Sequence, residues 1–249
     1  MNPTTAGTLL VGEPLERRLE ELLHQDFFKP PATFVAEARV NDASLHADAE
    51  LDPDGFWADQ ARLLHWDKPF TTVLDDSNPP FYKWFTDGTL NVSYNCLDRH
   101  IEAGIGNRVA FHWAGEEGEE RAITYHDLHH DVQRMANALK DMGVAKGDVV
   151  GIFLPMIPEV VVAMLACARI GAPHNVVFGG FAPEAVKERM EVSRAKALIT
   201  VDGARRKGTT APVKEQVDTT MPGAHGQCVD RQPPDRGRSG RGPSRRGCA

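Results

Sequence analysis

The strongest pattern in the sequence lies between Val149 and Val201, and it reads VVGIFLPMIPEVVVAMLACARIGAPHNVVFGGFAPEAVKERMEVSRAKALITV. Three short runs without a charged residue predict strands: Val149–Phe153, His174–Phe178 and Ala197–Val201. Apolar residues at helical spacing between these runs predict two helices: Pro158–Ile170 and Pro183–Val192. The short joints favour parallel strands with right-handed crossovers, and strands this apolar belong to a sheet covered on both faces. The predicted fold class is therefore α/β, with a partial three-layer αβα core around a parallel sheet.

The residues just upstream predict a β-hairpin. Arg108–Trp113 and Arg121–Tyr125 flank an acidic, glycine-containing turn at Gly115–Glu120. The four glutamates of this turn have no apolar wall that would separate their pKa values. We therefore interpret the turn as a solvated surface feature and not as an acid/base site.

A long helix is predicted next. Thr124 is its N-cap, Asp127 provides a variant of the capping box, and Gly143 ends it. Two apolar stripes are expected to face the core: Leu128, Val132, Met135 and Leu139 on this helix, and Val161, Met164, Leu165 and Ala168 on the helix Pro158–Ile170. His126 and His130 have the spacing of a metal-binding pair, but Asp127 replaces the Glu of the zinc-protease pattern. We interpret both, together with His129, as histidines on a solvent-exposed face.

The N-terminal residues divide into two predicted segments. Residues 1–50 are a weakly ordered leader with one short helix at Glu13–His24, and ordered structure is expected to begin near Leu51. Residues 51–107 form an extension with helices at Phe56–Leu64 and Tyr94–Ala103. The aromatic and proline-rich residues between these helices cannot form a long helix, so they are expected to wrap over a neighbouring domain.

Composition excludes several classes of protein. The 249 residues weigh 27.4 kDa and are 41% hydrophobic and 25% charged, which fits a folded chain and not a wholly disordered one. A net charge of −7 does not favour nucleic-acid binding. Four scattered cysteines predict reduced thiols in a cytoplasmic protein: Cys96, Cys167, Cys228 and Cys248. Pro155 and Pro158 interrupt the most apolar stretch, so no membrane-spanning helix is expected, and the N-terminus shows no secretory signal.

Residues 222–249 differ in character from the rest. Gly, Arg and Pro make up 16 of these 28 residues, and six Arg against two Asp give a local charge of +4. Such a segment cannot bury enough apolar surface to offset its chain entropy, so we predict a disordered basic tail. Its abrupt start after Met221 suggests out-of-frame translation, and RNA binding through the arginines is the alternative.

Several long runs resemble AMP-forming acetyl-coenzyme A synthetases, which belong to the adenylate-forming superfamily. The clearest are these: NPPFYKWF at Asn78–Phe85, GTLNVSYNCLDRH at Gly88–His100, PMIPE at Pro155–Glu159 with AMLACARIGA at Ala163–Ala172, and VVFGGF at Val176–Phe181. The resemblance extends over roughly Asp26 to Val217. It implies that residues 51–107 are the family's N-terminal extension and that residues 108–221 are the start of its AMP-binding domain, truncated.

The resemblance implies a two-step ligase. Acetate attacks the α-phosphate of ATP to give acetyl-adenylate and pyrophosphate, with Mg²⁺ neutralising phosphate charge, and the CoA thiol then takes the acetyl group and releases AMP. The family's CoA site falls on five residues of this sequence: Gly180, Arg206, Lys207, Gly208 and Thr209.

Two segments carry these five residues. Gly180 stands in the turn after the second strand, where a missing Cβ lets a nucleotide approach the backbone; the alternative is a glycine needed only for tight packing. Arg206–Thr209 lie in the loop after the third strand, where Arg206 can bind the 3′-phosphate of CoA; the alternative is a mobile basic loop. Relatives usually carry a basic residue where this sequence has Thr209, so CoA binding is expected to be weakened unless Arg205 or Lys207 compensates.

Other parts of the family site lie downstream of the resemblance. Arg206–Thr209 cannot replace the family's phosphate loop, because the glycine spacing of a Walker loop is missing and no helix of apolar period is expected to follow. We therefore predict no ATP or Mg²⁺ site, no catalytic residue, and a ligase fragment that is inactive alone. Two alternatives stay open: a non-enzymatic module that binds CoA or pairs with a full-length relative, and a fragment of a propionate–CoA ligase. The unpaired sheet edge of a truncated core predicts aggregation or association.

Overall fold

The computed structural model describes residues 13–24, 29–40, 42, 44–206 and 208–221. The chain divides into two units, residues 1–59 and 60–249, and the prediction for residues 222–249 lies outside the described part. In the first unit, α1 (Glu13–Leu23) matches the predicted N-terminal helix. Two short helices that the sequence did not predict follow, α2 (Ala32–Glu37) and α3 (Ser44–Leu51), and α4 (Pro53–Arg62) matches the next prediction to within three residues at each end.

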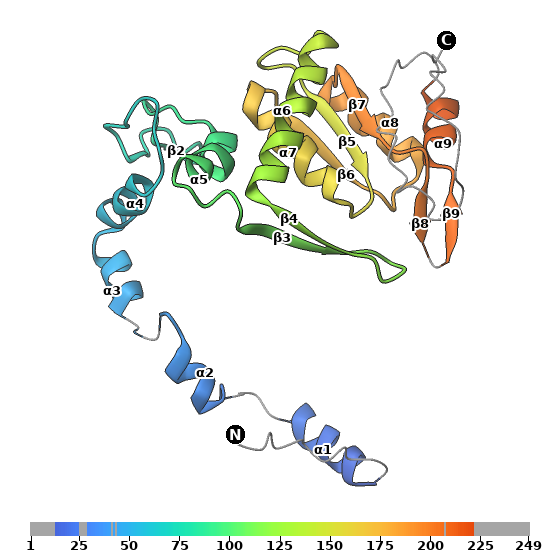
Figure 1. Cartoon of the computed structure of the whole chain (residues 1–249). Helices are drawn as coiled ribbons and strands as arrows, with labels where there is room; N and C mark the ends of the chain where they lie inside the picture. Colours follow the sequence, from blue (N-terminus) through green and yellow to red (C-terminus); the bar gives the residue numbers. More distant parts are fainter. Residues whose placement is uncertain (1–12, 25–28, 41, 43, 207, 222–249) are drawn as a thin grey trace. The chain divides into compact units, whose positions relative to one another are not determined.

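A parallel sheet of three strands forms the centre of the second unit (Figure 1). Its strands are β5 (Val150–Leu154), β6 (His174–Phe178) and β7 (Ala197–Thr200), in the order β6-β5-β7. Ile152 of β5 is in register with Val176 of β6 and with Ile199 of β7. All five residues of β5 are buried, because this strand has a neighbour at each edge. The three predicted strands are confirmed to within one residue at their ends.

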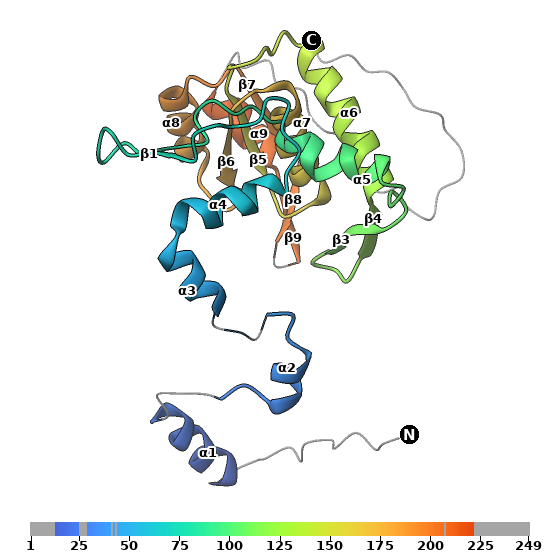
Figure 2. The same cartoon turned by 90° about the vertical axis from the view of Figure 1, so that its left-hand side faces the viewer.

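Helices pack against both faces of this sheet. β6 and β7 lie on opposite sides of β5, so right-handed crossovers place α7 (Pro158–Ile170) and α8 (Pro183–Ser193) on opposite faces. Figure 2 shows α8 on one side of the sheet and α6 (Tyr125–Asp141) on the other. The predicted αβα layers are therefore confirmed.

The ends of these helices follow the predicted local rules. Thr124 accepts a hydrogen bond from the backbone N–H of Asp127, and the Asp127 carboxylate accepts one from the backbone N–H of Thr124, which completes a capping box. α7 ends at Gly171, which adopts a left-handed conformation with φ of 72°.

The buried face of α7 differs from the predicted stripe. Its side chains with least exposure are Val162, Ala163, Ala166 and Cys167, whereas Met164 is 37% exposed. Nearly every residue of α7 is apolar, so the periodicity could not select one face. The two alanines explain the outcome, because small side chains let a helix approach its neighbours closely.

Three hairpins accompany the core, and one of them is β3 (Val109–Ala114) with β4 (Glu120–Thr124), as predicted. The second pairs β1 (Leu74–Asp75) with β2 (Lys83–Trp84) inside the aromatic segment. The third pairs β8 (Ala204–Arg206) with β9 (Thr209–Ala211), where the sequence predicted only a loop.

α9 (Val213–Thr220) follows the third hairpin, where the sequence predicted no helix of apolar period. Only Val213 and Val217 are buried on α9, and a single apolar pair is too short a pattern to predict a helix.

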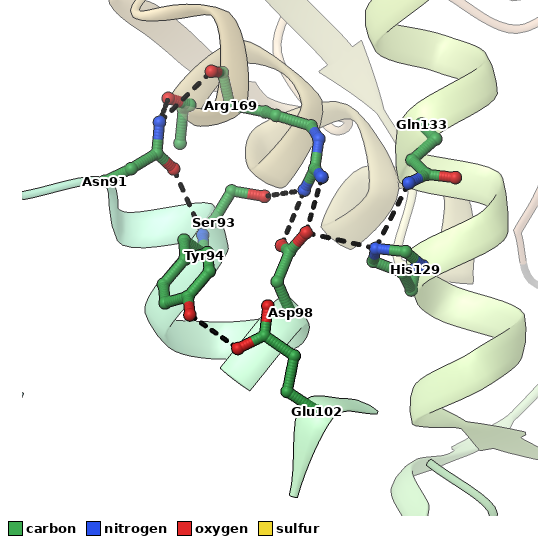
Figure 3. A network of polar contacts seen from close by, with 9 residues as sticks. Asn91, Ser93, Tyr94, Asp98, Glu102, His129, Gln133 and Arg169 are labelled. Carbon is green, nitrogen blue, oxygen red and sulfur yellow. Dashed lines mark hydrogen bonds and ion pairs between the residues drawn. The ribbon is translucent and has the colours of Figure 1, made fainter. Parts of the chain in front are cut away.

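A network of polar contacts joins the N-terminal extension to the core within the second unit (Figure 3). The predicted helix near Tyr94 is present as the π-helical turn η1 (Tyr94–Asp98) followed by α5 (Arg99–Glu102). The two guanidinium nitrogens of Arg169 on α7 donate to the Asp98 carboxylate at 2.6 and 2.7 Å, and this pairing lowers the pKa of Asp98. The Nε2 atom of His129 on α6 lies 3.2 Å from the same carboxylate. His129 is therefore partly buried and paired, which corrects its predicted place on a solvent-exposed face, whereas His126 and His130 are exposed as predicted.

Across the described part of the chain, no helix combines the length and apolar character that a bilayer crossing would require.

Candidate CoA-binding site

Gly180 lies in the turn between β6 and α8, at the carboxyl end of a parallel strand. Ligands of open α/β sheets bind outside these carboxyl ends, at the point where the strand order reverses. The neighbouring residue, Gly179, is closely packed: a Cβ at this position would lie 3.0 Å from the backbone oxygen of Leu154. Gly180 itself is exposed. Tight packing therefore explains Gly179, and the exposed Gly180 stays a predicted position for the approach of a nucleotide.

The second predicted segment forms the tip of the β8–β9 hairpin. Arg206 is in register with Thr209, so the connection between β8 and β9 is a tight one. Gly208 has φ of 74°, a left-handed conformation that side chains with a Cβ adopt only at a cost. Lys207 lies outside the described residues. Gly208 therefore has a structural reason to be glycine, and the hairpin fixes the backbone positions of Arg206 and Thr209 opposite each other.

The topology brings both segments to one edge of the sheet. β6 and β7 run parallel to β5, so their carboxyl ends open on the same edge. Gly180 follows β6 by two residues, and the β8–β9 hairpin begins four residues after the end of β7 (Figure 1). This shared edge is the candidate site, and of the five predicted residues the structure describes Gly180, Arg206, Gly208 and Thr209.

Arg205 was considered a possible substitute for a basic residue at Thr209, but the register separates the two. Arg205 is in register with Thr210, one step along from the pair formed by Arg206 and Thr209. Successive residues of a strand point to opposite faces, so Arg205 and Thr209 belong to opposite faces of the ribbon.

The Arg205 guanidinium instead contacts the acidic turn between β3 and β4. It forms an ion pair with Glu117, and its Nη1 atom lies 3.3 Å from Oε1 of Glu119. The turn is exposed, as predicted, but two of its carboxylates are paired and not merely solvated. No local sequence pattern predicts this contact, because 88 residues separate Arg205 from Glu117.

Among residues 13–24, 29–40, 42, 44–206 and 208–221, no group of three His, Cys, Asp or Glu side chains could hold a metal ion. Two of the predicted free thiols are described, with Cys96 exposed and Cys167 buried. Burial raises the pKa of Cys167 to about 11, so its reactive thiolate form is scarce near neutral pH.

Comparison with known proteins identifies relatives over most of the chain. The model of the acetyl-coenzyme A synthetase N-terminus matches residues 43–96, and the model of the AMP-binding enzyme matches residues 97–244. Among curated proteins, the chain is 55% identical over 194 residues to an acetyl-coenzyme A synthetase of Streptomyces avermitilis, a match that covers 78% of the chain and 30% of the relative. It is 53% identical over 195 residues to the acetyl-coenzyme A synthetase of Mycolicibacterium smegmatis, a match that covers 78% of the chain and 21% of the relative. It is 51% identical over 209 residues to the acetyl-coenzyme A synthetase of Burkholderia lata, a match that covers 82% of the chain and 32% of the relative.

The chain thus spans about a third or less of the length of these curated relatives. The AMP-binding model alone matches more than half of the chain, and its match includes the parallel sheet and the β3–β4 and β8–β9 hairpins. These findings show that the chain belongs to the AMP-binding enzyme family, and that its residues 43–96 are similar to the N-terminus of acetyl-coenzyme A synthetases.

Proposed function

We propose that this chain supplies the CoA-nucleotide contact of an AMP-forming acetate–CoA ligase. The overall reaction converts ATP, acetate and CoA to acetyl-CoA, AMP and pyrophosphate through acetyl-adenylate. Support comes from the 55% identity to a protein named acetyl-coenzyme A synthetase, and from the match of the AMP-binding enzyme model to residues 97–244, which include both halves of the candidate site. Acetate, ATP and Mg²⁺ enter the proposal through the family alone, and no step is assigned to a metal here. We also propose a cytoplasmic location, in keeping with free thiols at Cys96 and Cys167.

The candidate site can serve the CoA step by holding the nucleotide end of the substrate. A guanidinium at Arg206 can donate two parallel hydrogen bonds to a phosphate, and such charge-assisted bonds are about twice as strong as neutral ones. The hairpin turn at Gly208 presents this position beyond the edge of the sheet, and Gly180 leaves room for the nucleotide at the end of β6. Anchoring the nucleotide would lower the entropy that the CoA thiol must lose to reach an acyl carbon.

The test compares CoA with dephospho-CoA, which lacks the 3′-phosphate, by isothermal titration calorimetry on the full chain. We expect CoA to bind more tightly than dephospho-CoA, and the substitution Arg206→Ala to remove that difference. The matched control is Arg134→Ala, which removes the same charge from an exposed position on α6. Equal affinities for the two ligands in the unmodified chain would contradict the proposal.

A further inference from the structure

The β8–β9 hairpin is too small to hold its own orientation. Each strand has three residues, and an isolated two-stranded ribbon is marginally stable in water. Its base is fixed at the end of β7, where the backbone N–H of Lys214 donates to the backbone oxygen of Asp202 at 3.2 Å. The tip, which carries Arg206 and Thr209, needs a second point of attachment if it is to present a defined binding surface.

The acidic turn between β3 and β4 offers that attachment, because it is anchored to the core. The indole nitrogen of Trp113, at the end of β3, donates to the backbone oxygen of Met156 at 2.8 Å. The turn is closed by a hydrogen bond of 2.7 Å from the backbone N–H of Gly115 to the backbone oxygen of Glu119. A side chain that pairs with this turn is therefore connected to the sheet through a second route.

Arg205 makes this connection from one face of the ribbon. Its guanidinium pairs with Glu117 and lies 3.3 Å from Glu119, and all three side chains are about half exposed. The register places Thr209, and the backbone position of Arg206, on the opposite face. The acidic turn thus contacts the face of the hairpin that lies opposite the proposed phosphate-binding face.

We propose that Arg205 is a positioning residue for the CoA phosphate site, and that Glu117 and Glu119 are its partners in this role. The inference rests on the proposed function, since it assigns the 3′-phosphate of CoA to the other face of the same hairpin. Pairing with the acidic turn restricts the hairpin to the orientation that binds phosphate, so less conformational entropy is lost on binding.

Substituting Glu117 distinguishes this role from simple electrostatic repulsion. If the acidic turn only repels the phosphate, Glu117→Gln removes a negative charge and strengthens CoA binding. If the turn positions the hairpin through Arg205, the same substitution weakens CoA binding. Exposed ion pairs are weak, so we expect loss of the Glu117 and Glu119 contacts together to lower the CoA affinity by about two- to fivefold.

The experiment measures CoA and dephospho-CoA affinities by calorimetry for Glu117→Gln combined with Glu119→Gln, and for Arg205→Met. Glu120→Gln is the matched control for the charge change, because it lies on the same hairpin at the start of β4. We expect both pairing variants to lose two- to fivefold in CoA affinity at unchanged melting temperature, with little change for dephospho-CoA. The exchanged pair, Arg205→Glu with Glu117→Arg, should recover part of the loss.

The outcomes separate the two proposals. A variant that lacks Glu117 and Glu119 and binds CoA as tightly as the unmodified chain, or more tightly, overturns the positioning role of Arg205 while CoA binding stands. An unmodified chain that does not distinguish CoA from dephospho-CoA overturns the proposed function, and the positioning role with it.

Discussion

The substitution Asp98→Asn tests whether one partly buried ion pair secures the N-terminal extension to the core. The Asp98 side chain is 16% exposed and that of Arg169 is 24% exposed, so water screens their attraction only in part. Removing the charge of Asp98 replaces two short bonds to Arg169 by weaker ones and leaves the guanidinium without a counter-charge. Breaking a fully buried pair costs about 3–5 kcal/mol, and the partial exposure here reduces the expected loss of unfolding free energy to about 2–3 kcal/mol.

Urea denaturation followed by far-ultraviolet circular dichroism measures this loss. The matched control is Glu191→Gln, which breaks the exposed 3.9 Å pair with Lys187 on α8 and should cost less than about 1 kcal/mol. A double-mutant cycle with Arg169→Ala should give a coupling energy of the same order as the loss in Asp98→Asn. A loss no larger than that of the control would refute the reasoning.

The same pair predicts how stability depends on pH. Hydrogen bonds from Arg169 are the largest cause of the lowered pKa of Asp98, with a smaller contribution from His129. A carboxyl whose pKa is lower in the folded state binds fewer protons there than in the unfolded state. Its contribution is fully present above the unfolded pKa of about 4 and is lost as the pH falls through the lower folded value. Unfolding free energy should therefore fall below pH 4, and more steeply in the unmodified chain than in Asp98→Asn.

Three further predictions concern other parts of the second unit. Gly208→Ala, at φ of 74°, should strain the hairpin turn by about 1 kcal/mol and weaken CoA binding in calorimetry. A substitution at an exposed residue of α8 should leave the CoA affinity unchanged. Cys96 should react with a maleimide faster than Cys167, whose burial raises its pKa to about 11; equal rates would contradict the burial of Cys167. The isolated chain should show no acetate-dependent exchange of pyrophosphate into ATP, and turnover above background would refute the prediction that it is inactive alone.

The helices and strands of the core were predictable because the residues that start, form and end them lie close together in the sequence. The capping box joins residues only three positions apart, Thr124 and Asp127, and Gly171 ends α7 through its own backbone conformation. The strand β5 was recognisable because all five of its residues are apolar or glycine, as a strand with two covered faces requires.

Contacts between distant residues could not be predicted in the same way. His129 was assigned to a solvent-exposed face because its helix neighbours are polar, and its partner Asp98 lies 31 residues earlier. The pairing of Arg205 with Glu117 depends on two hairpins that meet only after the sheet has formed. The position of Gly180 and of Arg206–Thr209 at one edge was predictable from topology, but the face on which Arg205 lies needed the register of β8 and β9.

Strand β6 is more exposed than its sequence predicted. Its apolar residues predicted a strand covered on both faces, yet Val176 is 45% and Phe178 is 62% exposed, while Val177 is buried. β6 is also an outer strand of the sheet, with β5 as its one neighbour within the described residues. An apolar strand without a charged or proline residue lacks the features that protect sheet edges from pairing with other chains. The apolar residues of β6 are typical of a strand with both faces covered, but among the described residues Val176 and Phe178 stay exposed. For this reason we predict that other chains associate with the sheet along β6.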